Sequence, residues 1–283
     1  MKKVLLFGGS GNAGLHIAKI LQQQGYATTA VLRSEIKSSS VKNFVASTLI
    51  VNFKDPANIN GLCAGYDIVI SALGKSVSPF DTSRESFRAV DYNINAAILK
   101  DAVAAGVSKF IYVSAFHAEK YEGLEYFQVH QDFSDNLVRS GLNYSVIKPP
   151  AIFSAFKDLF SLAQKGQLVT LGKGDKKTNP IFEGDLAEII VNSITEKDVV
   201  IEAGGPEVLT RQGINEIIQR EIAPHKKIRR VPFWLIDFML PVIKLVSRNM
   251  YDKMAFFTAV MKEDAIAPVR GKLPFSEYVR GNK

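Results

Sequence analysis

The sequence predicts an α/β protein built on a doubly wound parallel sheet, with a smaller C-terminal α+β lobe. Three observations support this fold class. Short apolar runs alternate with helical periodicity over residues 1–150, which is typical of repeated βαβ units. The first run leads into a glycine-rich turn, VLLFGGSGNAG from Val4 to Gly14. The run DIVISA, from Asp67 to Ala72, is apolar without alternation, as expected for a strand covered by helices on both faces.

The glycine-rich turn predicts a dinucleotide site. Gly9, Gly11 and Gly14 fit G-x-G-x-x-G, and Gly8, Gly11 and Gly14 fit the related G-x-x-G-x-x-G. Either spacing removes side chains where a pyrophosphate approaches the backbone, and the helix that follows, residues 13–24, points its N-terminus at that phosphate. A tight turn without a ligand is the alternative, but its place in the first βαβ unit favours binding. The expected contacts are Gly8, Gly11, Asn12, Ala13 and Gly14.

The second expected strand, residues 27–32, is followed directly by Arg33. An acidic residue at this position binds the ribose 2′-hydroxyl of NAD, whereas a basic residue accommodates the 2′-phosphate of NADP. Arg33 therefore favours NADP over NAD, and Lys37 could reinforce the phosphate site. Glu35, two residues further on, is the acidic alternative that would favour NAD. Arg33 could also be an ordinary surface arginine.

Further strands are expected at residues 49–51, 67–72, 109–114 and 144–147, which gives five or six parallel strands with helical crossovers. Ligands bind at the carboxyl ends of such strands. The cofactor contacts expected at these ends are Asn52, Phe53, Ala72, Leu73 and Gly74, the first two beside the adenine. Asp55-Pro56 is typical of a helix start and has a structural role. Two longer helices are expected over residues 84–105, ended by Gly106, and 124–140.

Pro149-Pro150 separates two regions of different character, a nucleotide-binding domain at 1–150 and a lobe at 151–283. In the second region the expected strands are short, at residues 179–182, 199–202 and 228–231. Helices are expected at 184–194 and 211–222. No linker precedes residue 151, so we expect the lobe to pack on the first domain, to close over the sheet edge and not to fold independently.

Two apolar helices are expected at the end of the chain, over 233–247 and 251–262. Their large side chains are too many to leave exposed without consequence: Phe233, Trp234, Phe238, Met239, Phe256 and Phe257. A roof over the substrate pocket is the favoured interpretation, and a patch for a membrane surface or partner is the alternative, with Lys226, Lys227, Arg229 and Arg230 attracting anionic lipid. The apolar runs are too short to span a bilayer.

Composition restricts the other possibilities. The 283 residues are 47% hydrophobic and 22% charged, an ordinary globular composition. The single cysteine, Cys63, excludes a disulfide framework and favours a reducing compartment, so we expect a cytoplasmic protein. The apolar run in MKKVLLF is too short for a signal peptide. The four histidines lack metal-ligand spacing, and no metal is expected. The net charge of +7 suits an anionic cofactor, whereas no motif indicates nucleic acid.

With these elements in place, the chain resembles the atypical short-chain dehydrogenases/reductases of the NmrA-like, NAD(P)-binding kind. The resemblance extends over most of the chain and is more specific than the glycines alone. It rests on these blocks: VLLFGGSGNAG, DYNINAAILKDAVAAGVSKFIYVSA, YFQVHQDFSDNLVRSGLNYSVIKPP, NPIFEGDLAEII and GGPEVLTRQGINEII. It implies a Rossmann fold, NAD(P) binding and a substrate lobe made by the C-terminal part.

The resemblance also implies catalytic residues. The family's serine falls on Ser114, its tyrosine on Tyr126, and its lysine, four residues after the tyrosine, on His130. In the family the tyrosine exchanges a proton with the substrate oxygen, the serine orients that oxygen, and the lysine lowers the tyrosine pKa and holds the nicotinamide ribose. A neutral histidine could still bind the ribose. The replacement of lysine by histidine impairs reduction less than oxidation, because a proton donor needs only a neutral tyrosine.

Structural roles compete with these assignments. Tyr126 and His130 could be inward-facing core residues of one helix, Ser114 could be a cofactor contact, and His117 could line the pocket or belong to a loop. Three functions therefore remain. The leading one is an NADP-dependent reductase of a small carbonyl or conjugated substrate. His130 favours a non-catalytic nucleotide sensor, and the basic, aromatic C-terminus favours a membrane-surface or complex-associated subunit.

Overall fold

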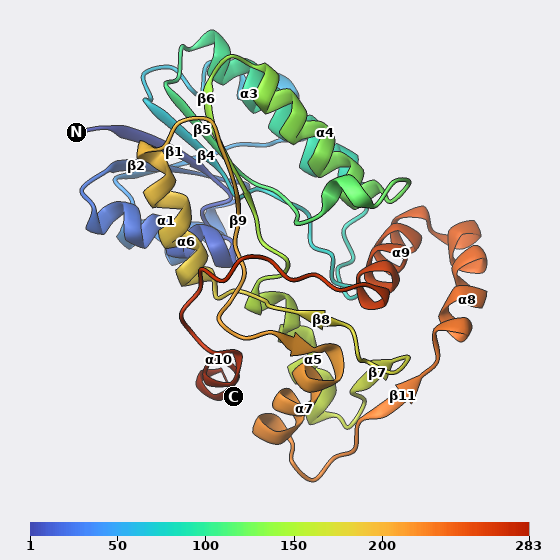
Figure 1. Cartoon of the computed structure of the whole chain (residues 1–283). Coiled ribbons are helices and arrows are strands. Elements are labelled where there is room, and N and C mark those ends of the chain that lie inside the picture. The colour runs from blue at the N-terminus through green and yellow to red at the C-terminus, as the bar shows by residue number, and fades with distance from the viewer. Residues whose placement is uncertain (283) are drawn as a thin grey trace.

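Seven parallel strands form the main sheet of the computed structural model, which describes residues 1–282 without the side chain of Lys37. Their order is β3-β2-β1-β4-β5-β6-β9 (Figure 1). The strands are β1 (Lys3–Phe7), β2 (Ala27–Leu32), β3 (Ser47–Ile50), β4 (Ile68–Ser71), β5 (Lys109–Val113), β6 (Asn143–Lys148) and β9 (Val199–Glu202). The first six follow the Rossmann order, which reverses between β1 and β4.

Helices cover both faces of this sheet (Figure 1). On one face lie α1 (Asn12–Gln23) and α6 (Glu183–Asn192), and on the other lie α3 (Asn95–Ala104) and α4 (Glu125–Arg139). Successive residues of β1 point to opposite faces, so Val4 and Leu6 join the first core whereas Leu5 and Phe7 join the second. The predicted doubly wound α/β fold is therefore confirmed.

The helix predicted over 84–105 starts later and contains an irregular segment. It opens with η4 (Arg88–Ile94), which is π-helical, and continues as α3. The segment before it has no helical structure, and there the side chains of Lys253 and Asn249 donate to the carbonyls of Asp81 and Ser83. A π-helical segment is often found at functional sites.

The residues after 150 divide between the sheet and a separate lobe, which differs from the prediction. Strand β9, which the sequence assigns to the lobe, pairs with β6, and α6 packs beside α1. The expected strand at 179–182 is reduced to a bridge between Ile152 and Ile181. Pro180 explains the break, because it has no N–H to donate.

The lobe proper has its own small core, built around Phe153, Phe160 and Phe275. It contains two two-stranded sheets, β8 with β10 and β7 with β11. Its elements are α5 (Lys157–Gln164), β7 (Val169–Leu171), β8 (Lys177–Thr178), β10 (Leu209–Thr210), α7 (Arg211–Ile222), β11 (Arg229–Val231) and α10 (Phe275–Gly281).

The two apolar helices form a hairpin, α8 (Phe233–Val246) followed by α9 (Arg248–Lys262), at one side of the molecule (Figure 1). Helix α9 packs toward α4, and the ring of Phe256 contacts Tyr126. Helix α8 has no buried residue at all. The favoured expectation of a pocket roof is therefore wrong for Trp234 and Phe238 of α8, because both side chains are exposed. Phe233 is half-buried and packs beside Gly172 of the lobe. Among the described residues, no helix has the length and apolarity needed to cross a bilayer.

Candidate functional site

The glycine-rich turn connects β1 to α1 at the point where the strand order reverses. Gly8 has a φ of +80°, and a Cβ there would lie 2.6 Å from the carbonyl oxygen of Ala72. A Cβ on Gly14 would lie 2.1 Å from the carbonyl oxygen of Gly8, and the amide of Gly11 donates to that same oxygen at 2.9 Å. Positions 8 and 14 therefore need glycine, because the turn passes so close to the backbone around it that a Cβ would clash.

The N-terminus of α1 is open toward the carboxyl edge of the sheet. Gly11 is the N-cap residue and offers no side-chain acceptor, so the first-turn amides, including those of Asn12 and Ala13, can bind an anion. Gly74 is exposed beside the same edge, after β4. This arrangement fits the pyrophosphate of a dinucleotide. Ala72 is half-buried just after β4, whereas Leu73 is buried in the core on one face of the sheet.

Arg33 lies just after β2, where the sequence predicts the adenosine end of the site. Its side chain is exposed, and no hydrogen bond or ion pair joins it to the described residues. Glu35 is exposed in the short helical turn that follows, and the side chain of Lys37 lies outside the described residues. Phe53 is buried with its ring 6.2 Å from that of Phe7, so it belongs to the core, and Asn52 accepts from the amide of Lys54.

Tyr126 and His130 lie on one face of α4, one turn apart, with ring centroids 4.6 Å apart. The half-buried ring of Tyr126 also contacts Phe256 of α9 at 4.3 Å and Phe87 at 5.3 Å. Burial raises the pKa of Tyr126 well above its usual value, and the nearby Asp91 carboxylate raises it further. The Tyr126 hydroxyl is therefore protonated at neutral pH.

His130 does not act as a cation beside Tyr126. Its ring is 5% exposed, and burial lowers its pKa to about 4. Nδ1 lies 2.6 Å from the hydroxyl of the fully buried Tyr112, whose pKa burial raises. That hydroxyl keeps its proton and donates to Nδ1, so the ring proton is on Nε2, which faces Asp91 Oδ1 at 3.8 Å.

Ser114 and His117 follow β5 but have separate surroundings. The Ser114 hydroxyl is 3.1 Å from that of Ser134, which donates to the carbonyl of His130. His117 has a left-handed backbone, with φ of 55°, and stacks on Phe116 with 3.7 Å between ring centroids. Both residues remain near the carboxyl edge, but their contacts tie them to protein neighbours.

Asp91 is a buried carboxyl group that the sequence did not single out. It is 1% exposed in η4, and its Oδ1 accepts from the amide of Lys75 at 3.0 Å. Oδ2 has no hydrogen-bond partner among the described residues. Burial raises the pKa of Asp91 to about 8. The only signal for this site is the pair Asp91 and Asn95, two polar residues one turn apart that are both buried; the Asn95 side chain donates to the Asp91 carbonyl.

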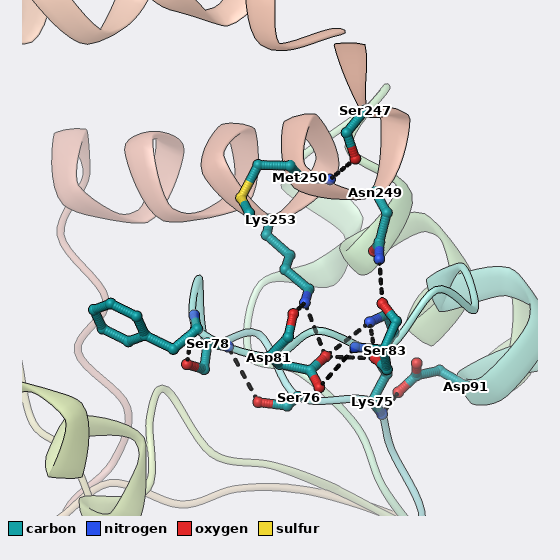
Figure 2. A network of polar contacts seen from close by, with 11 residues as sticks. Lys75, Ser76, Ser78, Asp81, Ser83, Asp91, Ser247, Asn249, Met250 and Lys253 are labelled. Carbon is teal, nitrogen blue, oxygen red and sulfur yellow. Dashed lines mark hydrogen bonds and ion pairs between the residues drawn. The ribbon is translucent and has the colours of Figure 1, made fainter.

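A second buried network joins the loop after β4 to α9 (Figure 2). Lys75 Nζ and Lys253 Nζ both contact Asp81 Oδ2, at 3.0 and 2.8 Å, and the Lys253 side chain is 1% exposed. Burial alone would raise the pKa of Asp81, but hydrogen bonds from Lys253, Ser83 and Lys75 hold that pKa far below its usual range. No sequence spacing indicates this network, since Asp81 and Lys253 are 172 positions apart.

Comparison with known proteins agrees with this geometry. A family model described as NAD(P)H-binding matches residues 8–219. The divinyl chlorophyllide a 8-vinyl-reductase of Cucumis sativus is 27% identical over 268 residues, which cover 87% of this chain and 63% of that protein's length. The chain thus spans less than two thirds of this relative.

Two solved structures cover nearly the whole chain. The triphenylmethane reductase of Citrobacter sp. complexed with NADP(H) gives a TM-score of 0.74 at 17% identity and covers 99% of this chain and 100% of that one. The NADPH-dependent quinone oxidoreductase QOR2 of Escherichia coli complexed with NADPH gives 0.73 at 16% identity and covers 99% of both chains. At these identities the likeness shows the fold.

Proposed function

The chain belongs to the NAD(P)H-binding family, and from this premise we propose that it is an NADPH-dependent reductase of a small carbonyl or conjugated substrate. The observation that carries the proposal is Tyr126, a protonated hydroxyl at the carboxyl edge of the sheet with a neutral histidine beside it. Such a group is suited to giving a proton, which is the requirement of reduction. Its single cysteine, Cys63, is buried, in keeping with the cytoplasmic location we also propose.

The proposed cofactor is NADPH, which would supply a hydride. Gly8, Gly11, Asn12 and Ala13 would hold its pyrophosphate at the open N-terminus of α1. Arg33 would bind the 2′-phosphate, because its guanidinium is exposed and unpaired among the described residues at the position that selects the cofactor.

The role of Tyr126 differs from that of the family's tyrosine in one respect. The family pattern pairs the tyrosine with a lysine, whereas His130 is buried, neutral and bonded to Tyr112. Among the described residues, none beside Tyr126 lowers its pKa. In the reducing direction Tyr126 would donate its proton to the developing substrate oxygen or carbanion, while oxidation, which needs a phenolate, is disfavoured.

The surroundings of Tyr126 support an apolar, flat substrate. The rings of Phe87 and Phe256 flank it, and Phe127 lies 5.2 Å away between ring centroids. These rings pack directly on Tyr126, and an aromatic environment of this kind would favour a conjugated ligand that stacks beside them.

The test is NADPH oxidation with a panel of quinones, enones and aldehydes, comparing the parent chain with Tyr126→Phe. We expect turnover of at least one substrate and a loss of about 100-fold or more in kcat for the variant, with NADPH affinity unchanged. Tyr121→Phe is the matched control, because Tyr121 stacks on Phe127 in the same aromatic cluster. Turnover at the parent rate in Tyr126→Phe would refute the catalytic role.

A nucleotide sensor is the second candidate, and the burial of His130 favours it. A residue bonded to Tyr112 inside the core is not free to bind a ribose. A sensor would bind NADPH and NADP⁺ with clearly different affinities and would reduce no substrate of the panel. Titration of both nucleotides by calorimetry distinguishes the two candidates.

A further inference from the structure

The outer side of α8 is a continuous apolar stripe. Trp234 is 68% exposed, Phe238 74% and Leu245 89%. Four more apolar side chains complete the stripe at helical spacing: Leu235, Met239, Val242 and Val246. Exposed apolar residues are common singly, but a contiguous stripe over the full length of a helix marks an interaction surface.

The two charged side chains of α8 are both engaged with α9. Asp237 accepts two bonds from Lys262 Nζ, at 2.8 and 2.9 Å. Lys244 Nζ lies 5.1 Å from the ring centroid of Tyr251. The outward stripe therefore carries no charge, and α8 stands at the outer edge of the molecule with α9 behind it (Figure 1).

The base of this hairpin is held firmly. Lys253 reaches from α9 to the carboxylate and carbonyl of Asp81, and Asn249 donates to the carbonyl of Ser83 (Figure 2). Because α9 is tied to the sheet domain through these buried bonds, α8 is displayed on a fixed support rather than on a loose tail.

We propose that α8 docks on an anionic lipid surface, lying in the plane of the interface with its apolar stripe among the acyl chains. Basic side chains lie at both ends of the helix. Exposed Lys226, Lys227, Arg229 and Arg230 precede it, and exposed Lys244 and Arg248 lie at its end. A helix with an apolar face, interfacial aromatic residues and flanking cations has the composition of such a monotopic anchor.

The same charges disfavour a second copy of this chain as the occupant. In a twofold dimer the same patch faces itself. A parallel pairing of two α8 helices would bring the two basic clusters that precede them together, and an antiparallel pairing would bring each against Lys244 and Arg248 of the other. Like charges meet in either case, whereas anionic lipid complements them.

The chain's single tryptophan, Trp234, lies within the stripe and reports docking directly. The probe is unilamellar vesicles of phosphatidylcholine with a third of phosphatidylglycerol, compared with pure phosphatidylcholine. We expect the Trp234 emission to shift to the blue with the anionic vesicles, to be quenched by lipids brominated on the acyl chains, and to recover at high salt. Emission unchanged by anionic vesicles would overturn the proposal.

Variants separate the stripe from the charges. Phe238→Asp removes a central apolar contact and should weaken vesicle binding more than about tenfold. Each basic residue removed, in Lys226→Gln and Arg230→Gln, should weaken binding about fivefold. Val138→Asp is the control, because it places the same charge on an apolar residue of α4 that is 44% exposed.

Folding and self-association are checked on the same samples. Phe238 is exposed, so Phe238→Asp should keep the parent melting temperature and NADPH affinity. Equal vesicle binding by Phe238→Asp and the parent contradicts the proposal. A blue shift that depends on protein concentration without vesicles, with a dimer in sedimentation, would assign the stripe to a second copy and overturn lipid docking.

Discussion

The candidate site has two halves. The half formed by β1 and α1 is called the glycine half, and backbone contacts set its geometry. Gly8 passes against the carbonyl of Ala72, and Gly14 against that of Gly8. In the tyrosine half, formed by the loop after β4, η4, α4 and α9, buried polar groups set it. Asp81 holds two lysines there, and Asp91 faces His130.

The two halves therefore respond to different changes. The glycine half needs the absence of side chains, so substitution there should affect the turn and its ligand. The tyrosine half needs compensated charges, and breaking one partner should affect folding and pH dependence. Four substitutions test this difference between the two halves, and the one with the largest expected effect is given first.

Asp81→Asn is expected to have the largest effect. It leaves the ammonium groups of Lys75 and Lys253 without their shared carboxylate, and a buried pair broken in this way costs about 3–5 kcal/mol of unfolding free energy. The control is Asp132→Asn, whose ion pair with Arg88 is exposed and worth at most about 1 kcal/mol. Urea denaturation measures both. Equal losses in the two variants would show that the Asp81 network does not stabilise the tyrosine half.

Arg33→Ala should lower NADPH affinity by about 1.5–3 kcal/mol while leaving NADH affinity nearly unchanged, because a charge-assisted contact to the 2′-phosphate is lost. Calorimetric titration of both nucleotides gives the ratio. An unchanged ratio of NADPH to NADH affinity would mean that Arg33 does not select the cofactor.

Asp91 should make stability fall as the pH rises from about 4 to about 8. Burial raises its pKa to about 8 in the folded chain, against about 3.9 when unfolded, so its contribution is complete below about pH 4 and is lost as the pH rises through about 8. The contribution of His130 to stability changes with pH in the opposite direction. Burial lowers the pKa of His130 to about 4, so its contribution is lost as the pH falls.

Between about pH 4 and 6.5 these two contributions cancel, each changing by about 1.4 kcal/mol per pH unit. The decline due to Asp91 emerges between about pH 6.5 and 8 and amounts to about 2 kcal/mol. Asp91→Asn should abolish it in denaturation curves taken across this range. A variant that declines as steeply as the parent would assign the pH dependence to other groups.

Gly8→Ala and Gly25→Ala form a matched pair with nearly equal φ, +80° and +77°, but only Gly8 has close neighbours. Both variants lose about 1–2 kcal/mol to left-handed backbone strain. Gly8→Ala should lose at least about 1 kcal/mol more through the contact with Ala72, and it should also weaken NADPH binding. Thermal unfolding and nucleotide titration measure the excess. If the two variants lost equal stability, close approach at Gly8 would not be the constraint.

The parts of the fold and site that depend on local chemistry could be predicted from the amino-acid sequence. Apolar runs and glycine spacing predicted the strands, the turn and the opening of α1, because φ, steric clearance and side-chain alternation act over a few residues. Arg33 was identified in the same way, from its place directly after β2. The position of Tyr126 and His130 on one helical face followed from helix periodicity.

The surroundings of these residues depend on contacts between segments that are far apart in the chain. Asp81 and Lys253 meet across 172 positions of the chain, and no pattern in either segment reveals the other. The same limit applies to the C-terminal hairpin. Helix α9 is partly buried although it carries the charged residues Asp252 and Lys253, because the rest of the fold supplies contacts for them. The more apolar α8 has no buried residue. Hydrophobicity gives the tendency of a helix to be buried, but the surface available to receive it is a property of the whole fold.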